Sequence, residues 1–201
     1  NLFITGKAGC GKSTLLEYFR QNTNKNHVIL APTGVTAIKA KGSTIHKFFK
    51  FPPRFVTKED VKVFRDRNFF SRLETLLIDE SSMIRSDIFD LIDLSLKKNR
   101  RNKKPFGGVQ IILFGDLLQL SPVVSSAEKE VVEKFYPKGA YFFNARCFHS
   151  GKFVTKELSK IFRQTDVNFI NLLNKFRIAK VDSRDLSIIN KRIIKENSDL
   201  P

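Results

Sequence analysis

Short continuous apolar runs alternate along the chain with longer segments in which apolar residues recur every three or four positions. The continuous runs are typical of buried strands, and the three-to-four spacing is typical of amphipathic helices. Strands are predicted at Leu2–Thr5, Val28–Ala31, Thr75–Asp79, Val109–Phe114, Tyr141–Phe143 and Phe153–Leu158. Helices are predicted at Ser13–Gln21, Val35–Ala40, Ser86–Lys98, Glu128–Phe135, Asp166–Ile178 and Ser183–Lys195.

This alternation predicts an α/β fold, with a mostly parallel sheet flanked by helices on both faces. Strands buried on both faces are expected to be apolar throughout, as most of these runs are. Ser86 and Ser183 are predicted helix N-caps, because each is followed by an acidic residue in the next turn.

Two stretches interrupt the pattern. Phe51-Pro52-Pro53-Arg54 is a structure breaker, and the mixed segment that follows it to Arg72 is predicted to be a small insertion or loop. The basic run Lys97–Pro105 has to leave a helix and turn, so it is either a solvated loop or a phosphate contact.

The first predicted strand runs directly into Gly6-Lys7-Ala8-Gly9-Cys10-Gly11-Lys12-Ser13, which has the pattern G-x-x-x-x-G-K-[ST] of a phosphate-binding loop. Glycines let the backbone turn tightly and bring N–H groups to phosphates. A helix is predicted to follow, with its N-terminus facing the anion. The nucleotide-binding residues are predicted to be Gly6, Ala8, Gly9, Cys10, Gly11, Lys12, Ser13 and Thr14.

A phosphate loop needs further groups before it can hydrolyse a nucleotide. Lys12 is expected to reach the β- and γ-phosphates of ATP, and the Ser13 hydroxyl is expected to bind Mg²⁺. Asp79 and Glu80 lie at the end of the predicted strand at 75–79. Asp79 would hold Mg²⁺ through water, and Glu80 would polarise the attacking water. A surface pair of acids closing a strand is the alternative.

Two later residues are weaker candidates. Gln119 follows the predicted strand at 109–114 and either contacts the γ-phosphate or the attacking water, or is a loop amide. Arg163 either stabilises transition-state charge, as arginine fingers do, or is structural. The residues predicted to be catalytic are therefore Lys12, Glu80, Gln119 and Arg163, with Ser13 and Asp79 as metal ligands.

Charge adds a second partner to this picture. The 201 residues carry 36 Lys and Arg against 20 Asp and Glu, a formal net charge of +16. This excess favours a polyanionic partner such as nucleic acid, although a solvated basic surface is the alternative. No apolar run approaches the ~18 residues that a membrane helix needs. The two cysteines, Cys10 and Cys147, form neither a disulfide framework nor a zinc site, which is typical of a reduced, intracellular protein.

Taken together, the motifs resemble those of the first RecA-like motor domain of superfamily 1 DNA helicases, specifically the PIF-type family of the RecD-like branch. The resemblance runs from Leu2 to about Asn190, and its Thr-Ile-His-x-Phe-Phe and Gly-Asp-x-x-Gln-Leu-x-Pro-Val stretches are more specific than the phosphate loop. The matching stretches are Phe3–Ser13, Ala31–Ala37, Gly42–Phe49, Ile78–Ile84, Pro105–Gln110, Gly115–Val123 and Phe162–Gln164.

The resemblance implies a RecA-like P-loop NTPase domain that uses ATP and Mg²⁺ and binds single-stranded DNA and DNA junctions. Arg163 matches an arginine that contacts the γ-phosphate in the family. Residues in the family's DNA-contacting or DNA-coupling motifs are Thr33, Gly34, Thr44, His46, Pro122 and Val123. Without the resemblance, His46 would be interpreted as a packed core histidine and Thr44 as a helix cap.

The chain departs from the family pattern in two places and matches only part of it. Ser81 stands where the family usually has Ile, and Ser121 stands where it tends to have Pro, so tuning of activity is expected there. The family's second RecA-like domain has no counterpart in residues 1–201, and the chain starts at Asn1 inside its first strand. We therefore expect an N-terminal motor domain excised from a longer protein, and a monomer.

Two functions remain open from the sequence. The first is the ATPase half of a 5′-to-3′ DNA helicase, with ATP bound between this domain and a second one. The alternative is a nucleotide-gated DNA-binding switch that does not unwind DNA. The chain by itself is expected to hydrolyse ATP weakly or not at all, because one RecA-like domain completes neither the ATP site nor the DNA track.

Overall fold

The computed structural model describes residues 1–164 and 166–191. They fall into two compact units, which divide between Phe162 and Arg163. The first unit contains the sheet and the candidate site, and the second contains two helices. Each unit is described by itself.

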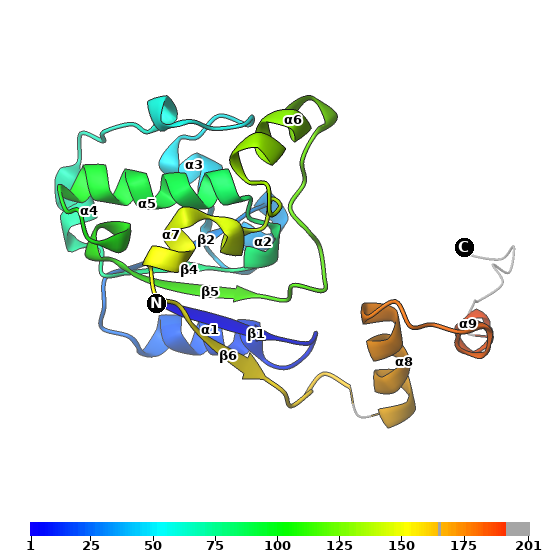
Figure 1. The fold of residues 1–201 in the computed structure, drawn as a ribbon. Coiled ribbons are helices and arrows are strands. Elements are labelled where there is room, and N and C mark those ends of the chain that lie inside the picture. Colours follow the sequence, from blue (N-terminus) through cyan, green and yellow to red (C-terminus); the bar gives the residue numbers. More distant parts are fainter. Residues whose placement is uncertain (165, 192–201) are drawn as a thin grey trace, which may run out of the picture. The chain divides into compact units, whose positions relative to one another are not determined.

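The first unit is built on a six-stranded sheet in the order β3-β2-β4-β5-β1-β6, and every pair of neighbours is parallel (Figure 1). This confirms the predicted α/β fold with a parallel sheet. The strands are β1 (Leu2–Gly6), β2 (His27–Ala31), β3 (Ser43–Thr44), β4 (Thr75–Ile78), β5 (Gln110–Gly115) and β6 (Val154–Leu158).

Helices cover both faces of the sheet, and the alternation of strand side chains divides the core in two. Phe3, Leu76 and Leu113 belong to the larger cluster, which also contains Phe89 of α5 (Ser86–Arg100). Their chain neighbours Ile4, Leu77 and Ile112 belong to the smaller cluster with Leu16 of α1 (Lys12–Asn22). Figure 1 shows α5 and α1 on opposite sides of the sheet. A parallel sheet needs this double cover, because successive side chains point to opposite faces.

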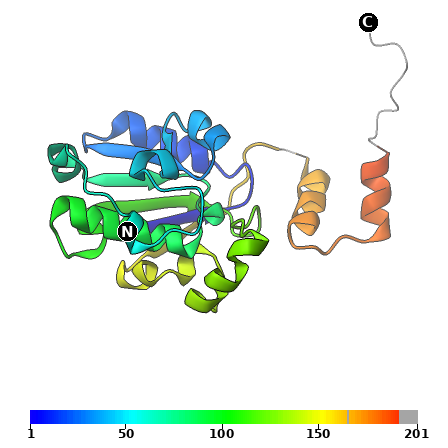
Figure 2. The ribbon, with the colours of Figure 1, turned by 90° about the horizontal axis from the view of Figure 1, so that it is seen from above.

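Strand order brings the sequence motifs to one edge of the sheet. β5 lies between β4 and β1, with Ile78 of β4 beside Leu113 and Thr5 of β1 beside Gly115. All three strands are parallel, so their carboxyl ends meet at the same edge (Figure 2). The segments that follow them are the phosphate loop, Asp79–Glu80 and Asp116–Gln119.

The structure contains short elements that the hydrophobic pattern did not predict. Strand β3 pairs only two residues with β2, and α3 (Ile45–Phe49), α4 (Arg67–Arg72) and α7 (Arg146–Ser150) are one or two turns long. The remaining helices of this unit are α2 (Gly34–Lys39) and α6 (Ser126–Phe135). The mixed segment that ends at Arg72 packs into the main core through Phe51, Val56, Val61 and Phe70. It is therefore part of the core of the unit.

The predicted strand at Tyr141–Phe143 is wrong. Phe142–Asn144 forms a short 3₁₀ helix, and Tyr141 makes only an isolated antiparallel bridge with Arg85. Phe142 is fully buried, and its ring packs edge-to-face against Phe3 at 5.3 Å between centroids. The aromatic run therefore fills the core over the sheet instead of extending the sheet. β6 is present as predicted but is an edge strand whose side chains are mostly exposed.

Both predicted N-caps are displaced by one residue. Arg85 is the N-cap of α5, and the Ser86 hydroxyl donates to the Tyr141 carbonyl at 2.7 Å. In the second unit, Asp182 caps α9 (Ser183–Asn190) and forms a capping box with Asp185. The second unit also contains α8 (Val167–Arg177). The predicted end of the last helix, at 192–195, lies outside the described residues. Among the described helices, none combines the length and the apolar character needed to span a bilayer.

Candidate functional site

The loop between β1 and α1 has the backbone that its glycines predict. Gly9 and Gly11 adopt φ values of 77° and 90°, which side-chain-bearing residues rarely adopt. A Cβ on Gly6 would lie 2.5 Å from the Leu158 carbonyl oxygen of β6, so only glycine fits there. Ser13 and Thr14 are exposed in the first turn of α1, where N–H groups have no partner within the helix. This loop has the form of an anion cradle.

Lys12 folds back over this loop. Its Nζ donates to the carbonyl oxygen of Gly6 at 2.6 Å and to that of Lys7 at 3.0 Å. Burial raises the pKa of both Asp79 and Glu80, and the nearby charge of Lys12 partly offsets this rise. The structure therefore brings together Lys12 and the two acids, which the sequence places far apart.

The two acids occupy different environments at the end of β4. Asp79 Oδ1 accepts a hydrogen bond from the Glu80 N–H at 3.0 Å, and burial raises the pKa of Asp79. Glu80 adopts a left-handed backbone conformation with φ 50°, so the extended strand ends before it. Burial and the neighbouring charge of Asp79 raise the pKa of Glu80. A carboxyl group with a raised pKa is suited to accept a proton.

Asp116 is a member of the site to which the sequence analysis assigned no role. It is fully buried at the end of β5, between the phosphate-loop strand and the strand that carries Asp79. Its Oδ2 accepts from the Gln119 side-chain amide at 3.0 Å, and its charge raises the pKa of Glu80. Gln119 is exposed and held in place by this bond. Asp116 could have been identified from the sequence, because the pair Gly115-Asp116 comes at the end of an apolar strand. The pair Asp79-Glu80 has the same position at the end of another strand.

The chain after β6 returns to the phosphate loop. The Phe162 N–H donates to the Gly9 carbonyl oxygen at 2.8 Å, and the Phe162 ring lies 4.0 Å from where a Cβ of Gly11 would be. Phe162 therefore supports the loop, a role that the sequence analysis missed. Arg163 is exposed and begins the second unit. Its role as an arginine finger stays a prediction.

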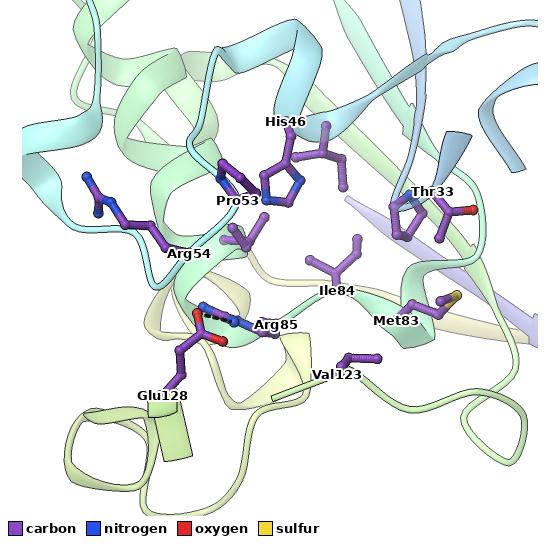
Figure 3. Close-up of a pocket in the computed structure, with 12 residues that line it drawn as sticks. Thr33, His46, Pro53, Arg54, Met83, Ile84, Arg85, Val123 and Glu128 are labelled. Carbon is purple, nitrogen blue, oxygen red and sulfur yellow. Dashed lines mark hydrogen bonds and ion pairs between the residues drawn. The ribbon is translucent and has the colours of Figure 1, made fainter. Parts of the chain in front are cut away.

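A pocket of about 230 Å³ lies near the ends of β2 and β4. Thr33, His46 and Val123, three of the residues predicted to contact DNA, line it together with Met83 and Arg85 (Figure 3). The other residues predicted to contact DNA are their chain neighbours Gly34, Thr44 and Pro122. Thr33 and Thr44 are also helix caps, because their hydroxyls accept from Thr36 N at 3.3 Å and from Lys47 N at 3.2 Å.

Arg85 lines this pocket as an ion-paired cation. Its guanidinium donates two hydrogen bonds to Asp87, at 2.9 and 2.6 Å, and one to Glu128 at 2.9 Å. Burial opposes the charge, but the two carboxylates outweigh it, so the pKa of Arg85 is raised. Figure 3 shows Arg85 and Val123 along one side of the pocket, with His46 and Thr33 along the other. The pocket thus combines apolar walls with an arginine whose charge is balanced by two carboxylates.

His46 is half-buried in this wall, and burial followed by the charge of Arg85 lowers its pKa, while Asp87 acts in the opposite direction. A histidine with a depressed pKa stabilises the fold above its unfolded pKa of ~6.5, and this contribution is lost as the pH falls towards the folded value. We expect the melting temperature of the chain to fall as the pH is lowered below about 6.5, and His46→Gln to reduce that fall. Thermal melts of the two proteins across this range test it. Parallel pH profiles would contradict the assignment.

The residues at the carboxyl edge fit a nucleoside triphosphate with its metal. Lys12 is a cation, the loop presents N–H donors, and Ser13 and Asp79 carry hard oxygen atoms of the kind that Mg²⁺ prefers as ligands. The Glu80 carboxyl group, whose pKa is raised, is suited to accept a proton beside them. Fold and site together define a RecA-like P-loop NTPase domain.

Comparison with known proteins identifies the family. Residues 1–186 match the family model described as PIF1-like helicase. The chain is 34% identical over 197 residues to the ATP-dependent DNA helicase PIF1 of Saccharomyces cerevisiae, and 35% identical over 185 residues to that of Xenopus laevis. These matches cover 90% of the chain, which spans 22% and 28% of the two relatives. The chain belongs to the PIF1-like helicase family.

Solved structures agree with this assignment. A Bacteroides Pif1 bound to ssDNA superposes with a TM-score of 0.92 at 42% identity, over all of this chain and 48% of that one. A Bacteroides Pif1 in complex with ADP-AlF3 and ssDNA gives 0.90 at 43% identity, over 99% of this chain and 48% of that one. The predicted RecA-like fold is therefore confirmed.

Proposed function

We propose that this chain is the N-terminal ATP-hydrolysing motor domain of a DNA helicase that moves 5′ to 3′ along single-stranded DNA. The convergence of Lys12, Asp79 and Glu80 at the carboxyl edge of one sheet carries this proposal. The second RecA-like domain of the helicase would lie outside the 201 residues. The relatives support this, because their names describe ATP-dependent DNA helicases and the chain spans about a quarter of their length.

The proposed roles in hydrolysis follow from the chemistry of each side chain. Lys12 neutralises the β- and γ-phosphates of ATP, and the loop from Gly6 to Thr14 holds them with N–H groups. Ser13 and Asp79 would hold Mg²⁺, which offsets the charge of the phosphate oxygens when bound. Glu80 accepts the proton of the attacking water. Gln119, oriented by Asp116, senses the γ-phosphate, and Arg163 acts as an arginine finger.

We place the DNA track along the same edge of the sheet, at the pocket lined by Thr33, His46 and Val123. Gly34 and Thr44 lie beside it in the chain, where small side chains let a DNA backbone approach closely. Bacteroides Pif1 has been solved with ssDNA, and another Pif1 structure concerns unwinding at forked dsDNA, which supports single strands and junctions as partners.

The segment from Asp116 to Val123 is the proposed link between the two sites. Asp116 orients Gln119 at the nucleotide site, and four residues later Val123 lines the pocket. A shift of Gln119 on loss of the γ-phosphate would therefore be passed along a short stretch of chain. Through this stretch, ATP hydrolysis would change the affinity of the proposed track for single-stranded DNA.

The proposal is tested by comparing the 201-residue chain with the intact protein. We expect brisk ATP hydrolysis stimulated by single-stranded DNA in the intact protein, and weak or undetectable hydrolysis in the chain alone. The reason is that ATP is expected to bind between two motor domains, of which the chain supplies one. Phosphate release with and without an oligonucleotide measures both, with circular dichroism as the check that the chain is folded.

Two outcomes would contradict this proposal. If the 201 residues alone turned over ATP as fast as the intact protein with DNA present, the site would be complete without a second domain. If the intact protein hydrolysed ATP without unwinding a forked duplex, the nucleotide-gated switch would be the better assignment.

A further inference from the structure

A cluster of cations lies at the amino edge of the sheet, at the other end of the strands from the nucleotide loop. His27, Thr75 and Gln110, the first residues of β2, β4 and β5, are in register at this edge. Helix α4 ends at Arg72, just before β4, and the C-terminal end of α5 leads by a turn into β5. Figures 1 and 2 both show α4 and this end of α5 together at the end of the sheet away from the phosphate loop.

Exposed cations lie after α3, before and at the end of α4, and at the C-terminal end of α5, and we call this set the amino-edge basic face. It consists of Lys50, Lys62, Arg65, Arg72, Lys98 and Arg101. None of the six forms an ion pair with an acidic side chain in the described part of the chain. Packing like charges together without partners is unfavourable for the isolated protein. The face is therefore suited to a polyanion.

The acidic side chains nearest to this face are already used by the backbone. Asp66 Oδ1 accepts from the Phe69 N–H at 3.1 Å and caps α4. Glu74 Oε2 accepts from the Asn26 N–H at 2.9 Å. One oxygen of each carboxylate is thus used by a backbone donor, and neither side chain forms an ion pair with these cations in the described part of the chain.

Aromatic rings lie between the cations. A groove of about 610 Å³ is lined by Lys50, Lys62 and Arg65 together with Asp66 and the rings of Phe64 and Phe69. Lys50 Nζ lies over the Phe64 ring, 5.5 Å from its centroid, and Phe69 is 42% exposed. The volume is within the ~300–1,000 Å³ typical of small-ligand sites. A groove with cations for phosphates and ring faces for bases is the arrangement that binds unpaired nucleotides.

The backbone under this groove is held firmly to α5. Arg100 donates to the carbonyl oxygens of Phe70, Ser71 and Leu73. Asn99 accepts from the Phe64 N–H at 2.8 Å and donates to the Lys62 carbonyl oxygen at 3.0 Å. The groove is therefore formed before any ligand arrives, which lowers the cost of ordering on binding.

We propose that the amino-edge basic face is a second binding surface for single-stranded nucleic acid, with phosphates on Lys50, Lys62 and Arg65 and a base against Phe64 and Phe69. It begins one helical turn from His46, because the Lys50 N–H donates to the His46 carbonyl oxygen. Its side chains line a different pocket from the one lined by Thr33 and His46. A single strand is favoured over a duplex, because only unpaired bases can stack on the rings.

The first test compares two variants of the full chain with equal net charge. Lys50→Gln/Lys62→Gln/Arg65→Gln removes three cations from the face, and Lys134→Gln/Lys138→Gln/Lys156→Gln removes three exposed lysines elsewhere. Each phosphate contact on a single strand contributes ~0.7 to the slope of log K against log salt. We expect the first variant to lower this slope by about 2 and the second to leave it unchanged. Equal slopes for both variants would overturn the proposal.

Stoichiometry separates this surface from the proposed DNA track. With an oligo-dT of about eight nucleotides, calorimetry is expected to count two sites on the unaltered chain. The face variant should keep one site, the proposed track. If the track assignment fails and the face holds, the unaltered chain has one site and the face variant has none. A single site on the unaltered chain that survives in the face variant would refute the second surface alone.

Base contact is tested by photo-cross-linking and by the choice of ligand. Oligonucleotides carrying 5-iodouracil are expected to cross-link to Phe64 or Phe69, and Phe69→Leu should reduce the yield while keeping an apolar side chain. Oligo-dT and oligo-rU arms show whether the sugar is discriminated. Binding of a duplex of the same length at least as tight as the single strand, with no cross-link to either ring, would contradict the single-strand assignment.

Discussion

Replacing Glu80 by Gln is expected to leave ATP binding intact and to lower turnover by ~10²–10⁴-fold, the range typical of general-base catalysis. The amide keeps the size and hydrogen-bonding capacity of the side chain but cannot accept a proton. Glu80 is suited to that step because burial and the charge of Asp79 raise its pKa. The measurement is DNA-stimulated phosphate release by the intact protein, with ATP affinity measured separately.

A matched control distinguishes loss of the base from a general loss of charge. Glu130→Gln changes an exposed acid on α6 and should leave both turnover and affinity unchanged. Glu80→Gln protein with full turnover would remove Glu80 from the catalytic role, because no other change was made to the site. Loss of ATP binding in the same variant would instead assign Glu80 to binding.

Lys12→Ala is expected to abolish measurable hydrolysis, with turnover lowered by at least about 10²-fold. Effects of this size are typical when one preorganised donor to the charge that develops in the transition state is removed. The effect on ATP affinity should be large as well, because the cation contacts phosphates before and during the reaction. In the structure Lys12 Nζ already lies over the loop, bound to the Gly6 and Lys7 carbonyl oxygens. In the proposed role, the ammonium group would exchange those carbonyl oxygens for phosphate oxygens.

Lys7→Ala is the control for this experiment. Lys7 belongs to the same loop, but only its carbonyl oxygen takes part in the hydrogen bond to Lys12, and alanine keeps that oxygen. We expect near-normal ATP affinity and turnover for Lys7→Ala. Equal losses in both variants would mean that the loop is sensitive to any substitution, and the specific role of Lys12 would be withdrawn.

Most of the fold could be predicted from the chain because its buried strands are continuous apolar runs. The sequence pattern located β1, β2, β4, β5 and β6 to within about two residues. It failed at Tyr141–Phe143, since three apolar residues have the same pattern in a strand and in a core-filling turn. Packing of Phe142 against Phe3 and Phe89 decided between them. The short β3, α3 and α7 carry too few residues to show a period.

The sequence by itself determined the class of chemistry, because the phosphate loop is one contiguous stretch whose glycines and Lys12 act through local backbone geometry. It also located Asp79 and Glu80, because both lie at the end of one recognisable strand. Only the tertiary structure decided that β5 lies between β1 and β4, which puts buried Asp116 at the centre of the site and ties Gln119 to it. It also decided that Lys50, Lys62 and Arg65 share one groove. Such contacts join residues distant in the chain, so strand order and side-chain direction govern them.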